Sequence, residues 1–382
     1  MLELLERIGY WPCYCVWELT LACNLKCLHC GSYAGAKRES ELTLEEAYRV
    51  ADALAELRCE RVTLSGGEPT LRPDWHLIGR RLTDRGVGVN IISNGYHWDD
   101  EQFARAHHAG LTNLGISLDG LEPAHDRVRR EGAFARTTST IDRAVAEGWR
   151  VAVVSHINTL NMHSLPEFAQ LLRDRGVVHW QLQLGLPSGH LTANRELVID
   201  PEELLWIVPL IAELQEQGGA ELEVVGSHNI GYYGKWERAL RQADDTPIDV
   251  WIGCRAGIHV IGIESNGNVK GCLSLPSAMH GEDRFVEGNA RERPLQEIWR
   301  DPETFGRNRS FDAGLLASFC GVCRYRDICR GGCSWAAYSY ATDRYDNPYC
   351  FYRQAVRLGR LDLLDDEELS ADELEVARRI ER

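Results

Sequence analysis

Three cysteines lie close together in the segment Cys23-Asn-Leu-Lys-Cys27-Leu-His-Cys30, at C-x3-C-x2-C spacing. In an iron–sulfur cubane, each iron that is tied to the protein is held by a cysteine thiolate. Three thiols on one tight loop can therefore hold three irons of a [4Fe-4S] cluster and leave the fourth iron open. The alternative is a structural zinc site, which requires four ligands at paired spacing, and no second pair lies near this loop.

A second group of cysteines fills the last third of the chain. The run that starts at Cys320 has C-x2-C-x5-C-x3-C spacing, and Cys350 follows sixteen residues after Cys333. Taken alone, residues 320–350 would also suit a zinc ribbon. The chain is long and has 13 cysteines, an odd number, many of them at metal-ligand spacing. This pattern favours reduced, metal-bound thiols over disulfides.

The segment Ser65-Gly66-Gly67-Glu68-Pro69 is the third chemical motif, and it follows the apolar run that ends at Leu64. Two adjacent glycines let the backbone approach a ligand closely because neither carries a Cβ. The alternative is a simple turn before a helix.

These motifs need a scaffold, and the hydrophobic pattern predicts one of repeated strands and helices. Thr43 and Glu46 form a capping box, and an apolar stripe at helical period follows them. Six β/α units are predicted, with strands near 14–20, 61–65, 88–93, 113–118, 150–157 and 179–184. Mostly apolar strands of this kind are typical of a parallel sheet covered by helices. In such folds the chemistry sits at the carboxyl ends of the strands, where the first cysteine loop falls.

Composition excludes several classes of protein. The 382 residues include 44% hydrophobic ones, enough for a sizeable core, and the net charge of -15 argues against a nucleic-acid binder. No apolar stretch reaches membrane-spanning length, and the first ten residues lack the layout of a secretory signal. We therefore expect a cytoplasmic protein without membrane or nucleic-acid partners.

The C-x3-C-x2-C loop resembles the defining motif of the radical S-adenosylmethionine (SAM) enzymes, in which the open iron is chelated by the methionine moiety of SAM. The later cysteines resemble the seven-cysteine SPASM domain of one subfamily, with a last spacing one residue shorter than the family pattern. The resemblance implies an α/β fold: a partial (β/α)6 TIM-type barrel, open on one side, followed by a small cysteine-rich α+β SPASM domain. The domains expected are an extension at 1–12, the barrel at 13–226, a linker at 227–250, the SPASM domain at 251–355 and an acidic helix or tail at 356–382.

The resemblance also implies three [4Fe-4S] clusters. Cys23, Cys27 and Cys30 would hold the cluster that binds SAM. The outer auxiliary cluster would take four thiols, from Cys320, Cys323, Cys329 and Cys350. The inner auxiliary cluster would have three, from Cys254, Cys272 and Cys333. Its fourth iron is either open or bound by another group, and His259 is the nearest candidate.

Several further residues are candidates for the SAM site. By resemblance to the family's GGE motif, Gly66, Gly67 and Glu68, with the adjacent Pro69, would bind the methionine amino group. Polar residues at later strand ends, Asn94, Ser117 and Asn158, are candidate SAM contacts, although each is also explained as an ordinary strand-end polar group. Cys15 could donate a hydrogen atom if it points into the barrel; otherwise it is an ordinary buried thiol.

The function implied is that of a radical SAM/SPASM oxidoreductase. It would cleave SAM reductively to a 5′-deoxyadenosyl radical, which takes a hydrogen atom from the substrate. Most SPASM relatives modify a peptide or protein, by crosslinking, epimerisation or oxidation. The alternatives are a small-molecule enzyme acting on a sugar or tetrapyrrole, and a non-catalytic iron–sulfur electron carrier.

The expected partners follow from this function. An electron donor such as flavodoxin or ferredoxin would reduce the cluster that binds SAM. Only 22 residues precede Cys23, which leaves no room for a fused leader-binding domain. A peptide substrate would then need a separate leader-peptide-binding protein or direct docking in the barrel.

Overall fold

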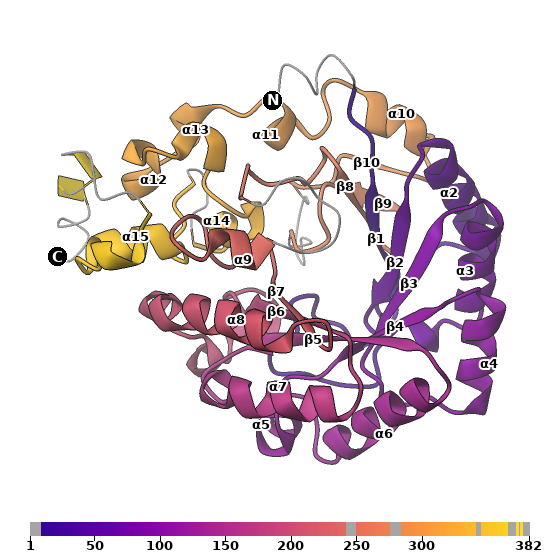
Figure 1. The fold of residues 1–382 in the computed structure, drawn as a ribbon. Coiled ribbons are helices and arrows are strands. Elements are labelled where there is room, and N and C mark those ends of the chain that lie inside the picture. Colours follow the sequence, from indigo (N-terminus) through magenta and orange to yellow (C-terminus); the bar gives the residue numbers. More distant parts are fainter. Residues whose placement is uncertain are drawn as a thin grey trace. The chain divides into compact units, whose positions relative to one another are not determined.

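The computed structural model describes residues 9–241, 250–275, 284–340 and 345–365, together with Asp372, Glu373, Glu375 and Val376. The chain divides into two compact units, each assembled from three segments. Figure 1 labels the helices and strands of the chain. The first unit comprises Met1–Ser117, His125–Val151 and Arg255–Phe311. The second comprises Leu118–Ala124, Ala152–Cys254 and Asp312–Arg382.

The first unit is built on a mainly parallel sheet. Four parallel strands follow one another in chain order: β1 (Tyr14–Thr20), β2 (Arg61–Gly66), β3 (Gly88–Ser93) and β4 (Asn113–Ser117). On the other side of β1 the chain adds β8 (Val260–Ile263), which is parallel to β1, then the antiparallel β9 (Asn268–Lys270) and β10 (Gly288–Asn289). The β8–β9 turn contains Gly267 with φ +93°, as is usual for an Asn-Gly turn in a β-hairpin.

Helices alternate with the strands, as the hydrophobic period predicts. The helices described between β1 and β5 are α2 (Leu44–Glu56), α3 (Trp75–Asp84), α4 (Asp100–His108), α5 (Glu122–Val128) and α6 (Ala133–Ala146). The predicted capping box begins α2: the Thr43 side chain accepts from the Glu46 backbone N–H, and Glu46 accepts from the Thr43 N–H at 2.8 Å. Two more helices of this unit, α10 (Leu295–Arg300) and α11 (Gly306–Arg309), follow β10.

The second unit holds three parallel strands and the last cysteines. β6 (His179–Leu184) lies between β5 (Arg150–Ile157) and β7 (Glu223–Gly226). The strand β7 was not among the six predicted. Its helices are α7 (Leu165–Asp174), α8 (Leu204–Gly218), α9 (Glu237–Arg241), α12 (Ser318–Val322), α13 (Arg326–Cys329), α14 (Ser334–Tyr340) and α15 (Phe351–Arg357). Within the described residues, no helix combines the length and apolar character needed to cross a bilayer.

Candidate metal and cofactor site

The loop that carries Cys23, Cys27 and Cys30 starts at the carboxyl end of β1 and is folded back on itself. The Cys23 N–H donates to the Gly35 carbonyl, and the Gly35 N–H donates to the Leu21 carbonyl, both at 3.0 Å. The backbone also supports the sulfurs, because the Leu25 N–H lies 3.4 Å from Cys23 Sγ and the Ala34 N–H lies 3.4 Å from Cys30 Sγ. The fold therefore brings the three predicted thiols onto one loop.

The donor set of this loop fits a cluster better than a single ion. Among the residues that the structure describes, no three His, Cys, Asp or Glu side chains converge on one point where a metal ion could sit. A mononuclear zinc site needs its ligand atoms about 2.0–2.3 Å from one centre, whereas a cubane places its thiolates on separate irons. Burial raises the pKa of the Cys23 thiol, so loading the cluster must displace a proton.

The two glycines of the Ser65–Pro69 motif lie against the end of β1 and the start of the cysteine loop. The Gly67 N–H donates to the Thr20 carbonyl and the Glu68 N–H donates to the Ala22 carbonyl, each at 2.8 Å. A Cβ on Gly66 would lie 2.2 Å from the Thr20 oxygen, and one on Gly67 would lie 2.3 Å from the Ala22 oxygen. The two glycines therefore make room for the backbone of residues 20–22, which leads into the cysteine loop. Their predicted contact with SAM stays a prediction.

The Glu68 side chain is fully engaged by protein donors. It is buried, and its carboxylate accepts from Thr70 Oγ1 at 2.7 Å, Ser93 Oγ at 2.9 Å and the Asn94 N–H at 2.8 Å. Burial raises the pKa of Glu68, and these hydrogen bonds oppose that rise. Asn94 in turn donates from Nδ2 to Asn24 Oδ1 at 2.7 Å. Glu68 and Asn94, both predicted site residues, therefore connect the ends of β2 and β3 to the cysteine loop; the adjacent Pro69 is also buried.

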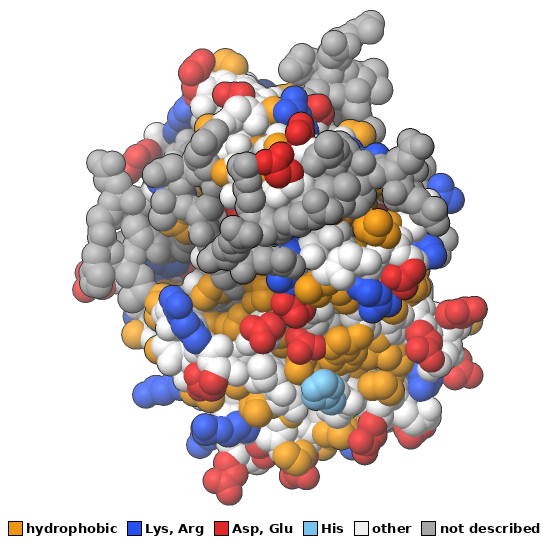
Figure 2. Space-filling view, turned by 90° about the vertical axis from the view of Figure 1, so that its left-hand side faces the viewer, with side chains coloured by type: hydrophobic (Ala, Val, Ile, Leu, Met, Phe, Trp, Pro, Cys, Tyr) orange, Lys and Arg blue, Asp and Glu red, His pale blue; other side chains and the backbone are white. Residues whose placement is uncertain are grey.

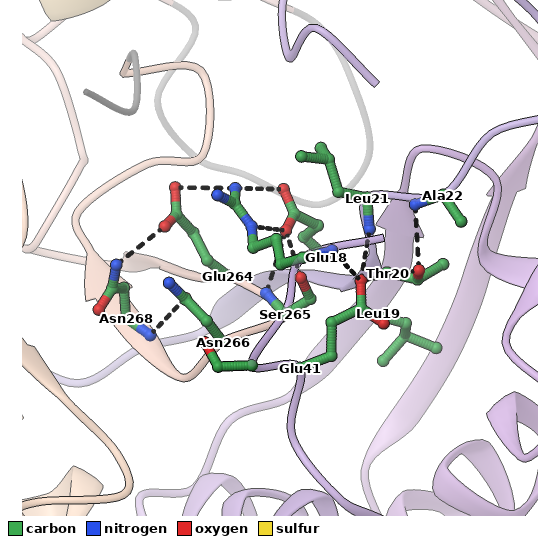
Figure 3. A network of polar contacts seen from close by, with 12 residues as sticks. Glu18, Leu19, Thr20, Leu21, Ala22, Glu41, Glu264, Ser265, Asn266 and Asn268 are labelled. Atoms are coloured by element: carbon green, nitrogen blue, oxygen red, sulfur yellow. Dashed lines mark hydrogen bonds and ion pairs between the residues drawn. The ribbon is translucent and has the colours of Figure 1, made fainter. Parts of the chain in front are cut away.

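A network of charged side chains that the sequence analysis missed surrounds the end of β1 (Figure 3). Glu41 accepts from Thr20 Oγ1 at 2.9 Å and from the Leu21 N–H at 3.0 Å. Glu18 accepts from Arg38 Nε at 2.9 Å and from Ser265 Oγ at 2.7 Å. The signal for this network was Glu18 itself, a charged residue within a buried strand, since a buried charge requires partners.

The same network extends into the β8–β9 hairpin. Lys270 is fully buried, and its Nζ lies 2.9 Å from Glu264 Oε1. Arg38 Nη2 lies 3.6 Å from the same Glu264 oxygen. The segment leading to Cys23 and the hairpin that ends just before Cys272 are thus held by one set of charges.

The other predicted residues of this site lie in separate surroundings. Ser117 is half-exposed at the end of β4. Asn158 is fully buried in the second unit, where its Oδ1 accepts from the Leu160 N–H at 2.9 Å and closes a turn. Cys15 is fully buried on β1, and burial raises the pKa of its thiol well above the usual value. Their roles toward SAM or substrate stay predictions.

The four thiols expected to hold the outer auxiliary cluster line one small cavity in the second unit. Tyr232, Tyr233, Phe319 and Tyr352 complete much of its wall. Burial raises the pKa of Cys320 to about 11 and that of Cys323 to about 12, and it raises the pKa of the other two thiols as well. Four soft donors around one cavity fit an iron–sulfur cluster, which would displace their protons on binding. The cavity is lined by Cys320, Cys323, Cys329 and Cys350.

The three thiols expected for the inner cluster belong to different segments. Cys254 and Cys333 lie in the second unit and Cys272 in the first. The Cys333 N–H donates to Tyr232 Oη at 3.0 Å. His259 Nδ1 lies 3.7 Å from Cys13 Sγ, and its ring packs edge-on against Trp11, so ligation of iron by His259 stays a prediction.

The chain matches two sequence-family models and resembles known proteins over most of its length. The Radical SAM superfamily model matches residues 17–175, and the SPASM model, described as an iron–sulfur cluster-binding domain, matches residues 254–331. The AdoMet-dependent heme synthase of Methanosarcina barkeri is 30% identical over 355 residues, covering 90% of this chain and 97% of that protein. The mycofactocin maturase MftC of Mycobacterium ulcerans is 31% identical over 340 residues, covering 86% and 84%.

Solved structures provide the matching fold. SuiB of Streptococcus suis bound to S-adenosylmethionine superposes with a TM-score of 0.70 at 17% identity, covering 91% of this chain and 78% of SuiB. At this identity the likeness concerns the fold alone. The predicted fold class is confirmed: a mixed α/β architecture with a parallel sheet, of partial-barrel type, followed by a SPASM domain.

Proposed function

Because this chain belongs to the radical SAM superfamily and carries a SPASM iron–sulfur domain, we propose that it is a peptide-modifying radical SAM enzyme. The bound cluster and SAM would supply an electron and a 5′-deoxyadenosyl radical that abstracts a hydrogen atom from the substrate. The observation that carries the SAM-dependent part of this proposal is the contact of Gly67 and Glu68 with the segment just before Cys23, through two 2.8 Å hydrogen bonds to the Thr20 and Ala22 carbonyls.

The role of the chain itself is to hold these groups and exclude water. Cys23, Cys27 and Cys30 would hold the SAM-binding cluster beside Gly66, Gly67, Glu68 and Asn94. The cavity of four thiols supports a second, outer cluster, and Cys254, Cys272 and Cys333 would hold a third. An external one-electron donor of the flavodoxin or ferredoxin type would reduce the SAM-binding cluster.

A peptide substrate is supported by the mycofactocin maturase among the relatives. SuiB, which shares the fold, has also been solved bound to its precursor peptide SuiA. A tetrapyrrole is the second candidate, because the match to a heme synthase extends over 97% of that protein. The two classes differ in what the neighbouring reading frames should encode: a short precursor peptide for the first and tetrapyrrole enzymes for the second.

The test is 5′-deoxyadenosine release by the anaerobically reconstituted enzyme with SAM and a strong reductant. We expect slow release without substrate and faster release when the correct substrate is added. A peptide from a neighbouring reading frame and iron coproporphyrin III would be compared in parallel. Acceleration by the tetrapyrrole alone would refute the peptide assignment, and absence of any release would refute the SAM chemistry.

The three thiols that would hold the inner cluster leave its fourth iron without a cysteine, and the ligand on that iron would decide which bond the enzyme forms. If that iron is open, it could take a substrate thiolate, a soft ligand suited to iron. Once the 5′-deoxyadenosyl radical had taken a hydrogen atom from a substrate carbon, the sulfur would bond to that carbon and the cluster would take up the one electron released, which gives a thioether. If His259 occupies it, the cluster can only relay electrons, and a dehydrogenation or carbon–carbon bond is expected. A protein ligand on that iron both with and without substrate would exclude the thiolate mechanism.

A further inference from the structure

Helix α8 is apolar on both its sides over residues 204–210. Its inward side is buried and consists of Leu204, Ile207, Val208, Ile211 and Leu214, together with Ala212. Leu205, Trp206, Pro209 and Leu210 are only partly buried. At about 100° per residue these four positions share a sector of about 140° on the outward side. A helix on a protein surface normally carries polar residues on that side, so the outward side of α8 requires an explanation.

The apolar surface continues beyond α8. The His163 ring is stacked on Trp206, with ring centroids 5.2 Å apart and planes 7° from parallel. Leu160, in the same loop as His163, is 46% exposed. We call this surface the α8 face; it consists of Leu160, His163, Leu205, Trp206, Pro209 and Leu210. Figure 2 looks onto the side of the molecule where α8 lies, and shows hydrophobic side chains gathered there with acidic side chains beside them.

The chain segment around the α8 face is rich in acidic residues, of which Glu202 is paired with Arg357. Residues 195–216 contain one basic residue, Arg195, and six acidic ones, most of which are exposed. Clustered charge of one sign on a surface creates a potential that attracts the opposite charge. The acidic residues are Glu196, Asp200, Glu202, Glu203, Glu213 and Glu216.

We infer that the α8 face is a docking surface for a partner protein that presents an amphipathic helix flanked by Lys and Arg. An apolar centre within a charged rim is the usual anatomy of a protein interface, and opposite charge on the partner gives both specificity and a fast encounter. Helix against helix is the packing that an apolar stripe on α8 offers. This inference concerns partner binding and stands independently of the substrate.

Charge disfavours two other occupants. A second copy of the chain that used the same face would bring one acidic rim against another, which is repulsive. The chain's own segment from Asp365 to Glu375 is also acidic, since its charged residues are all Asp or Glu. A partner that presents Lys and Arg would be attracted to the acidic residues around the α8 face and not repelled by them.

The test uses the reconstituted full-length enzyme and a fluorescently labelled 15-residue helical peptide of Leu and Lys, measured by anisotropy in 0.15 M salt. A matched peptide with Glu in place of Lys is the ligand control. The variant Leu205→Gln/Leu210→Gln removes apolar surface, and Leu315→Gln, at a leucine 40% exposed elsewhere in the second unit, is its control. The variant Glu196→Gln/Glu213→Gln removes charge and leaves the apolar surface in place.

We expect the double leucine variant to bind the basic peptide about tenfold more weakly or worse, because a few buried anchors carry most interface energy. The charge variant should bind more weakly and with a smaller dependence on salt, and Leu315→Gln should bind as the wild type does. Equal binding by all variants, or equal binding of the acidic peptide, would overturn the inference. Two further results would assign another occupant: a dimer that the leucine changes dissociate, or tighter peptide binding by a chain ending at Leu364.

Discussion

Replacing Gly67 by alanine should distort the cysteine loop. The new Cβ would lie 2.3 Å from the Ala22 carbonyl oxygen, and contacts below 3.0 Å are essentially never observed for a Cβ. The two backbones must therefore separate by about 0.7 Å, which stretches the Glu68–Ala22 hydrogen bond from 2.8 Å to about 3.5 Å, the limit of such a bond. Overpacking costs about 1–3 kcal/mol and a lost hydrogen bond about 1 kcal/mol. We expect Gly67→Ala to lower the free energy of unfolding by about 2–4 kcal/mol.

The matched control is Gly35→Ala in the same loop. A Cβ on Gly35 would meet no atom within 4 Å, and its φ is not in the left-handed region. Denaturant unfolding of the two metal-free variants gives the difference in stability. Iron analysis after reconstitution tells whether the displaced loop still holds its cluster; Gly67→Ala should lose iron and Gly35→Ala should not.

Two results would refute this reasoning. If Gly67→Ala unfolds at the same denaturant concentration as Gly35→Ala, the close approach of the two backbones is not what requires glycine. If Gly67→Ala also keeps all its iron but binds SAM more weakly, the glycine serves the ligand directly, as the sequence motif alone suggests.

Three further predictions follow from the site and its surroundings. Three cubanes correspond to about twelve irons per chain, and replacing Cys23, Cys27 and Cys30 by alanine should remove about a third of them; iron near four in the wild type would contradict the auxiliary clusters. Lys270→Met should lower the free energy of unfolding of the metal-free protein by about 3–5 kcal/mol, because the charge of buried Glu264 loses a partner. A decrease of less than about 1 kcal/mol, measured by urea unfolding, would contradict the ion pair between Lys270 and Glu264. The Arg291 guanidinium lowers the pKa of Glu46 from 4.5 to about 2. The stability that this ion pair contributes is therefore complete above pH 4.5 and is lost as the pH falls toward 2. In Glu46→Gln the urea midpoint should therefore decrease less over that pH range than in the wild type.

Much of the fold was predictable because its signals are local. The capping box of α2 and the apolar runs of β1 to β6 are readable from neighbouring residues. β7 was missed because Glu223–Gly226 has only four residues, too short for a periodic pattern. The family matches confirm the radical SAM and SPASM assignments, which rested on cysteine spacing.

The charged network at the end of β1 could not be predicted, because its partners are far apart in the chain. Glu18 meets Ser265 across 247 positions, and only the fold brings them together. The sequence indicates that a charge within β1 requires a partner, but it does not say which residue provides it. The contact that requires Gly66 and Gly67 could not be predicted for the same reason, since the backbone that packs against them belongs to residues 20–22.

The contacts around Cys23 also bear on how the first cluster is assembled. In many small zinc domains the metal organises an otherwise unfolded chain. Here the loop is fixed by protein groups: Glu41 binds the Leu21 N–H, Gly35 binds the Cys23 N–H, and Glu68 binds the Ala22 carbonyl through its own N–H. None of these bonds involves a thiol. Protein groups therefore arrange the loop before any cluster binds, and if the loop holds the proposed cluster, changes at Glu41 or Gly67 should affect cluster binding without removing a single ligand.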